Sequence, residues 1–166
     1  MIVYLADLAH DYLPARQFVP LGIGYLASYS NSIFGEKVEF HLFKSVDRLL
    51  DKCEVCEPDL VGFANYTWNE RLNAFAGGRL KKKFPELPII MGGPNIDIDE
   101  KGIGVFLGKY PYVDVYCMYS GEVSFSNIIQ HCLENPTKNN RVEMLRSGPV
   151  PGGYSLFEGD LRGSPS

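Results

Sequence analysis

Five short segments rich in β-forming residues alternate with five stretches of helical pattern over the first 135 residues, and this alternation constrains the fold most strongly. The segments are MIVYLAD, KVEFHLF, DLVGFANYTW, LPIIMGG and VDVYCMYSGE. Strands alternating with helices predict a parallel sheet with helices on both faces. Five such units favour an α/β, flavodoxin-like (Rossmann-like) doubly wound sheet with strand order 2-1-3-4-5.

The helices are expected at residues 20–35, 45–57, 69–85, 97–111 and 122–135. Pro20 suits the first turn of the first helix, and Ser45 is a plausible N-cap of the second. Beyond residue 135, RVEMLR reads as one more strand, and a segment rich in Gly, Pro and Ser follows. We therefore divide the chain into an α/β domain at 1–135 and a C-terminal extension or linker at 136–166.

Composition excludes several classes of function. The chain has 166 residues and a net charge of −4, and its longest basic run is Lys81-Lys82-Lys83. Nucleic-acid binding is disfavoured, because neutralising phosphates requires a clustered positive face. No apolar run approaches the ~20 residues that span a membrane, and the N-terminus lacks the features of a secretory signal. The sequence therefore predicts a cytoplasmic protein with neither a nucleic-acid partner nor a membrane partner.

Gly22, Gly24 and Ala27 match the G-x-G-x-x-G/A fingerprint of dinucleotide-binding proteins. In that motif the strand turns directly into the helix, so that the glycines meet the pyrophosphate. Here about a dozen residues separate Asp7 from Pro20, a loop too long for that tight turn. The second strand also ends without the acid that would bind a ribose. We infer that these small residues let a helix pack closely on a sheet or on a ligand.

Other ligands and sites common in such folds are also disfavoured. A receiver domain needs an acid after the third strand and a lysine after the fifth, where this chain has Asn65-Tyr66 and Tyr119-Ser120. The hydroxyl-rich phosphate loop of flavodoxins and the Walker-A pattern are both missing. Cys53 and Cys56 form a C-x-x-C pair in a helical stretch flanked by glutamates, which favours structural cysteines.

His10 follows Asp7 with the spacing D-x-x-H, which differs from the D-x-H-x-x-G motif of cobalamin carriers whose histidine binds cobalt. We do not expect His10 to be a cobalt ligand, and we predict no metal-ligating and no catalytic residue in this chain.

Distinctive turns follow three of the predicted strands: NYTWN, MGGPN and YSGE. The first offers aromatic rings, the second lets the backbone approach a ligand, and the third leads to a glutamate at the start of the last helix. Gly62 and Ala64 lie within the third strand, where missing side chains often mark close approach by another group. Together these turns predict a long, mostly uncharged crevice that suits a large flat ligand.

The ordered set PLGIGYLASY, PDLVGFANYTWN, LPIIMGGPN and VDVYCMYSGEVSF resembles the N-terminal cobalamin-binding domain of cobalamin-dependent radical S-adenosylmethionine (SAM) enzymes. The resemblance covers residues 1–135. It implies a cobalamin over the carboxyl edge of the sheet, with its nucleotide tail inserted alongside the strands. The residues that it implies as cofactor-binding are Pro20, Leu21, Gly22, Tyr66, Thr67, Trp68, Gly92, Gly93, Pro94, Ser120, Gly121 and Glu122.

In this family, methyl transfer or related radical chemistry uses SAM on a [4Fe–4S] cluster in a second domain. None of the four cysteines forms the C-x-x-x-C-x-x-C motif of such a cluster. The resemblance therefore implies an isolated or truncated cobalamin-binding domain that does not catalyse a radical reaction alone, its partner being a radical SAM barrel in the parent protein. The alternative is a flavodoxin-like interaction or regulatory module that binds no corrin and presents Tyr66 and Trp68 to another protein.

Overall fold

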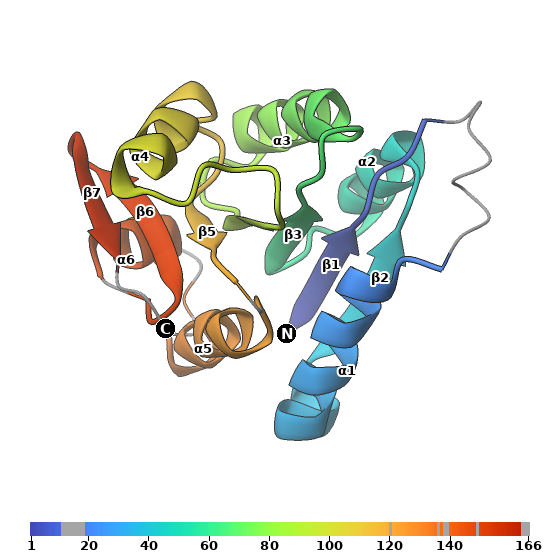
Figure 1. Cartoon of the computed structure of the whole chain (residues 1–166). Helices are drawn as coiled ribbons and strands as arrows, with labels where there is room; N and C mark the ends of the chain where they lie inside the picture. The colour runs from blue at the N-terminus through green and yellow to red at the C-terminus, as the bar shows by residue number, and fades with distance from the viewer. Residues whose placement is uncertain (11–18, 120, 136, 138–139, 149, 164–166) are drawn as a thin grey trace.

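The computed structural model describes residues 1–10, 19–119, 121–135, 137, 140–148 and 150–163. Their strands form one seven-stranded sheet of order β2-β1-β3-β4-β5-β6-β7 (Figure 1). The first five strands are parallel and confirm the predicted order 2-1-3-4-5. They are β1 (Ile2–Ala6), β2 (Glu39–Phe43), β3 (Leu60–Ala64), β4 (Ile89–Gly92) and β5 (Val115–Cys117).

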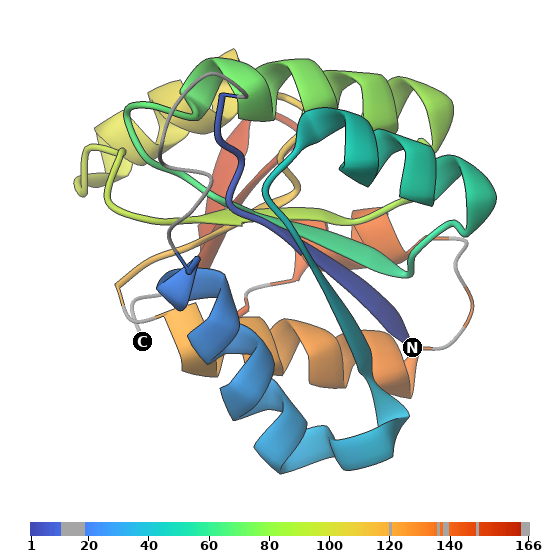
Figure 2. The same ribbon diagram turned by 90° about the vertical axis from the view of Figure 1, so that its right-hand side faces the viewer.

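Helices cover both faces of this sheet, as the alternation predicts. Two of them, α1 (Leu21–Phe34) and α5 (Gly121–Glu134), lie on one face and are drawn in blue and orange in Figure 2. The other face carries α2 (Val46–Val55), α3 (Glu70–Lys83) and α4 (Glu100–Lys109). A short 3₁₀ turn, η2 (Gly35–Lys37), follows α1. Buried hydroxyls of α1 and α5 meet where Ser30 Oγ lies 3.2 Å from Ser126 Oγ.

The side chains of β3 show how the two faces are built. Val61 and Phe63 belong to the apolar core under α2, α3 and α4, whereas Leu60 and Ala64 belong to the core under α1 and α5. Both sets are largely buried because a parallel sheet with helices on both sides exposes neither face. This explains why the strand reads as a continuous apolar run.

The C-terminal residues differ from the expectation. RVEMLR does not form a strand: it lies in a helix, α6 (Arg141–Ser147). The following segment adds β6 (Gly153–Phe157) and β7 (Asp160–Gly163), which run antiparallel at the β5 edge of the sheet and are red in Figure 1. The prediction of a five-stranded sheet was therefore incomplete, because β6 and β7 extend it.

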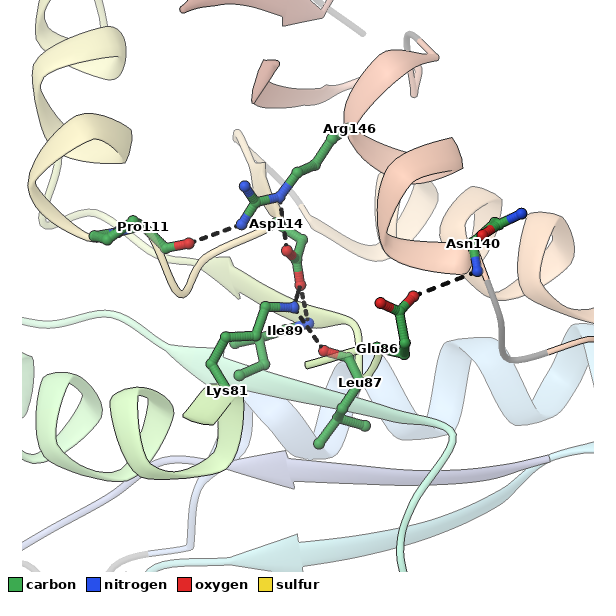
Figure 3. Close-up of polar contacts among 8 residues, drawn as sticks. All are labelled: Lys81, Glu86, Leu87, Ile89, Pro111, Asp114, Asn140 and Arg146. Atoms are coloured by element: carbon green, nitrogen blue, oxygen red, sulfur yellow. Dashed lines mark hydrogen bonds and ion pairs between the residues drawn. The ribbon is translucent and has the colours of Figure 1, made fainter. Parts of the chain in front are cut away.

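Two partly buried ion pairs hold α6 in place. Arg141 and Leu145 are its buried residues, four positions apart, and Arg141 Nη1 lies 3.2 Å from Asp59 Oδ1. Arg146 Nε lies 2.8 Å from Oδ1 of Asp114, the residue before β5 (Figure 3). One of the two buried residues of α6 is an arginine, so the spacing of hydrophobic residues alone does not predict this helix.

Asp114 is fully buried and joins three parts of the chain (Figure 3). Its Oδ2 accepts hydrogen bonds from Lys81 Nζ of α3 and from the backbone N–H of Ile89 at the start of β4, each at 2.7 Å. Its Oδ1 accepts from Arg146 of α6. The carboxylate thus has partners at both oxygens, as a buried charge requires.

The C-x-x-C pair is consistent with structural cysteines. Cys53 is buried in α2, Cys56 follows the end of that helix, and both are free thiols. Burial raises the pKa of the Cys53 thiol to about 12, which suppresses the reactive thiolate. Across the described ranges, no helix combines the length and apolar character needed to cross a bilayer.

Candidate functional site

A cavity of about 240 Å³ opens at the carboxyl ends of the parallel strands, on the face that carries α1 and α5. Strands β1, β3, β4 and β5 supply its floor, and the first turns of α1 and α5 supply its walls. Ligands of open α/β sheets bind at this edge. The lining residues are Leu5, Gly22, Ile23, Leu26, Gly62, Phe63, Ala64, Tyr66, Ile90, Met91, Gly92, Gly93, Cys117, Tyr119, Gly121, Glu122 and Phe125.

Missing side chains on adjacent strands make room for the cavity. A Cβ at Gly62 would lie 2.7 Å from Leu5 Cδ2, and one at Gly92 would lie 3.2 Å from the carbonyl oxygen of Cys117. Ala64, two residues after Gly62, points to the same face because side chains alternate along a strand. Small residues at these three positions therefore leave an apolar slot against the sheet.

Two aromatic rings stand at the end of β3. Tyr66 and Trp68 are stacked, with ring centroids 4.4 Å apart and planes only 6° from parallel. Tyr66 lines the cavity, and a Cβ on Gly22 of α1 would lie 3.4 Å from its hydroxyl oxygen. Trp68 is exposed. The pair thus presents a broad aromatic surface beside the opening.

The turn Gly92-Gly93-Pro94 at the end of β4 is held in place by buried polar groups. Asn65 Nδ2 donates to the Asn95 carbonyl at 2.9 Å and to the Tyr116 hydroxyl at 3.1 Å, and Tyr116 donates to the Gly93 carbonyl at 2.7 Å. Burial raises the pKa of Tyr116 to about 12, so the hydroxyl keeps the proton that it donates. These contacts fix the backbone of Gly93 at the rim of the cavity.

A row of buried asparagines fixes the turn that carries Tyr66. Asn69 Oδ1 accepts from the Tyr66 N–H at 2.9 Å and from Asn73 Nδ2 at 3.1 Å, while Asn69 Nδ2 donates to Asp7 Oδ1 at 3.3 Å. Asn73 Nδ2 also donates to the Ala64 carbonyl at 2.9 Å. Burial raises the pKa of Asp7, although Lys44 and the Asn69 hydrogen bond act in the opposite direction. The ends of β1 and β3 are thereby locked together.

The carboxylate of Glu70 also supports the glycine turn after β4, through Asn95. Glu70, the first residue of α3, accepts hydrogen bonds from the hydroxyl of Tyr110, from Lys109 Nζ at 3.1 Å and from Asn95 Nδ2 at 3.2 Å. The Tyr110 hydrogen bond is the largest of the contributions that lower the pKa of Glu70. The glycine turn is therefore tied to α3 as well as to β3 and β5.

The structure brings six of the twelve predicted cofactor-binding residues to the cavity: Gly22, Tyr66, Gly92, Gly93, Gly121 and Glu122. Five others do not line it, namely Pro20, Leu21, Thr67, Trp68 and Pro94. Of these, Leu21, Thr67, Trp68 and Pro94 are exposed near the opening, and Pro20 precedes α1. Ser120 lies outside the described residues.

The apolar side chains that line the cavity were not among the residues predicted from the sequence to bind a cofactor. Leu5, Ile23, Leu26, Ile90 and Phe125 line it from two strands and two helices. The alternation along β3 offered a signal, because the residues that share the face of Gly62 on neighbouring strands must border the same slot. Tyr119 was also missed, although it stands at a strand exit that the sequence singled out.

The cavity holds no metal-ligand set of the protein's own. Within the described residues, no three His, Cys, Asp or Glu side chains come together in a way that could bind a metal ion. Burial raises the pKa of Cys117, which lines the cavity, to about 11. The cavity is lined mainly by apolar side chains and glycines, with Glu122 as its one carboxylate among the described residues.

No protein-family model matches the chain. In sequence it is similar to the cobalamin-dependent radical SAM methyltransferase TokK of Streptomyces tokunonensis, with 29% identity over 118 residues that cover 68% of this chain and 17% of TokK. The chain therefore spans less than a fifth of the length of that relative.

Two solved structures share the fold. The cobalamin-dependent SAM radical enzyme OxsB, with aqua-cobalamin and SAM bound, has a TM-score of 0.69 at 18% identity, over 99% of this chain and 22% of OxsB. A cobalamin-binding protein from Desulfitobacterium hafniense has a TM-score of 0.57 at 16% identity, over 78% of this chain and 57% of that protein. These similarities confirm the resemblance drawn from the motifs: the chain is similar in sequence to part of a cobalamin-dependent radical SAM methyltransferase, and it shares its fold with two cobalamin-binding structures.

Proposed function

We propose that this chain is the cobalamin-binding domain of a radical SAM methyltransferase-like enzyme. The observation that carries the proposal is the apolar cavity at the carboxyl edge of the sheet, whose floor is opened by Gly62, Ala64 and Gly92. Its place in a fold shared with OxsB supports the same assignment.

The residues present fit this cofactor. The slot takes the flat, largely apolar base of the nucleotide tail, with Gly92, Gly93 and Pro94 passing beneath it. Pro20, Leu21 and Gly22 border the cofactor near the start of α1, and Ser120, Gly121 and Glu122 close the far wall. Tyr66, Thr67 and Trp68 face the lower side of the corrin, and the stacked Tyr66–Trp68 pair offers a rigid aromatic surface there.

When bound, cobalamin supplies a cobalt atom that can carry a methyl group. The role of this chain is to bind and orient the cofactor and to shield it from water. We assign the [4Fe–4S] cluster and SAM to a radical SAM domain of a parent protein; the four cysteines here do not form the cluster motif. The much greater length of TokK and OxsB supports this division of roles.

Mixing the purified chain with hydroxocobalamin is expected to leave a corrin absorption band after desalting and to quench the fluorescence of Trp68. Trp68 is the only tryptophan, so its emission reports on one place beside the cavity. Absorption and fluorescence titrations measure the two effects. In Trp68→Phe the absorption band should remain while the tryptophan fluorescence disappears. The variant therefore distinguishes cofactor binding from the fluorescence signal that reports it.

Loss of all colour on desalting, under reducing and oxidising conditions alike, would contradict the proposal. It would favour the alternative of an interaction module, in which Tyr66 and Trp68 contact another protein and Trp68 stays bright when cobalamin is added.

A further inference from the structure

Tyr119, just beyond β5, has a backbone conformation that tyrosine rarely adopts. Its φ is +54°, and within the described ranges only Asn140 and Glu158 are other non-glycine residues with positive φ. Asparagine tolerates this region, and Glu158 with Gly159 forms the two-residue turn between β6 and β7, which requires positive φ at both positions. An aromatic residue gains no such relief, so Tyr119 costs the fold stability.

The side chain does not recover that cost by packing in the core. Tyr119 is 69% exposed, whereas the preceding Met118 is buried and donates its N–H to the Gly152 carbonyl at 2.9 Å. In the ligand-free protein the backbone strain at Tyr119 is therefore not offset by burial of its side chain. Strain of this kind concentrates at functional sites.

Tyr119 lines the cavity on the side opposite Tyr66. Because β4 lies between β3 and β5, Gly92 and Gly93 lie between the ends of the strands that carry these two tyrosines. The opening thus has a floor of glycines and an aromatic residue at each side. Aromatic side chains on both sides of a bare backbone suit a planar ring system.

We infer that Tyr119 is a cofactor-contacting residue whose ring, on the side opposite Tyr66, packs against the planar part of the ligand that enters the cavity. This inference rests on the proposed function, in which that ligand is cobalamin. Tyr119 lines the opening in this strained conformation, and contact with the ligand offsets the cost that the free protein carries.

The test compares Tyr119→Asn with Tyr119→Phe and Glu158→Asn, using hydroxocobalamin titration and urea unfolding of the ligand-free chain. Asparagine relieves the strain and removes the ring, so Tyr119→Asn should lower the unfolding equilibrium constant by about tenfold and raise the Kd by at least about tenfold. Tyr119→Phe keeps the ring and should bind within about twofold of the unchanged chain. Glu158→Asn relieves similar strain in the β6–β7 turn, so it should stabilise the chain and leave the Kd unchanged.

Binding by the unchanged chain is measured first, and its absence would contradict the proposed function itself. If the unchanged chain binds, a Tyr119→Asn variant with the same Kd would overturn the inference about Tyr119 alone. A Tyr119→Asn variant that is less stable without ligand would also overturn it, because the ring would then have a structural role in the free protein.

Discussion

Gly93→Ala is expected to lower the free energy of unfolding by about 3 kcal/mol and to abolish retention of cobalamin. Gly93 has a φ of +133°, and a Cβ there would lie 2.4 Å from the carbonyl oxygen and 2.9 Å from the backbone nitrogen of Asn65. Both are backbone atoms at the end of β3, and the Asn65 N–H is already bonded to the Gly92 carbonyl at 2.7 Å. The turn can accept the methyl group only by moving away from β3, which distorts the rim of the cavity.

Gly104→Ala is the matched control for this substitution. Gly104 lies inside α4, and a Cβ there meets no atom within 4 Å. Alanine in an open helical position should raise stability by about 0.5–1 kcal/mol and leave cobalamin retention unchanged. Urea unfolding and corrin absorbance after desalting measure both variants. A Gly93→Ala chain as stable as the unchanged one would show that the turn after β4 is not held tightly against β3.

Asp114→Asn should cost about 3–5 kcal/mol of unfolding free energy. The substitution keeps the shape of the side chain but leaves Lys81 and Arg146 facing a neutral amide, and both cations are partly withdrawn from water. It also disturbs the connection among α3, the start of β4 and α6 (Figure 3). Chemical denaturation followed by circular dichroism gives the change in stability.

The exposed pair of Asp160 and Arg162 provides the comparison for Asp114. Its closest oxygen and nitrogen lie 3.5 Å apart at the surface of β7, so Asp160→Asn should change stability by less than about 0.5 kcal/mol. Equal effects of the two substitutions would contradict the expectation, because burial would then not set the strength of the Asp114 contacts.

The parallel part of the sheet could be predicted because each of its strands and helices carries a local signal. The run LVGFA is apolar at consecutive positions since β3 is buried on both faces, and the Gly-Gly-Pro turn marks the end of β4. The end of the chain carries no such signal. The burial of Arg141 depends on Asp59, a residue far away in the sequence, and β6 depends on the free edge of β5. Long-range contacts of this kind are invisible to a local pattern.

In the candidate site, too, only the residues with a local sequence signal could be predicted. Gly92 and Gly93 could be selected from the sequence because a glycine pair after a strand suggests close approach of the backbone, and both line the cavity. Tyr119 could not, because nothing in the letters YSGE shows that the tyrosine has a positive φ. The support from Asn65, Asn69 and Asn73 also escaped prediction, since buried amides are recognised only by the partners that they reach.

We propose that the cavity beside Gly62 and Gly92 holds the nucleotide tail of cobalamin. Cobinamide keeps the corrin ring and the cobalt but lacks this tail, so the Kd values of the two compounds show whether the tail contributes to binding. We predict that cobalamin binds at least about tenfold more tightly, because only its tail fills the apolar slot. Equal affinity for the two compounds would show that the cavity does not bind the nucleotide tail.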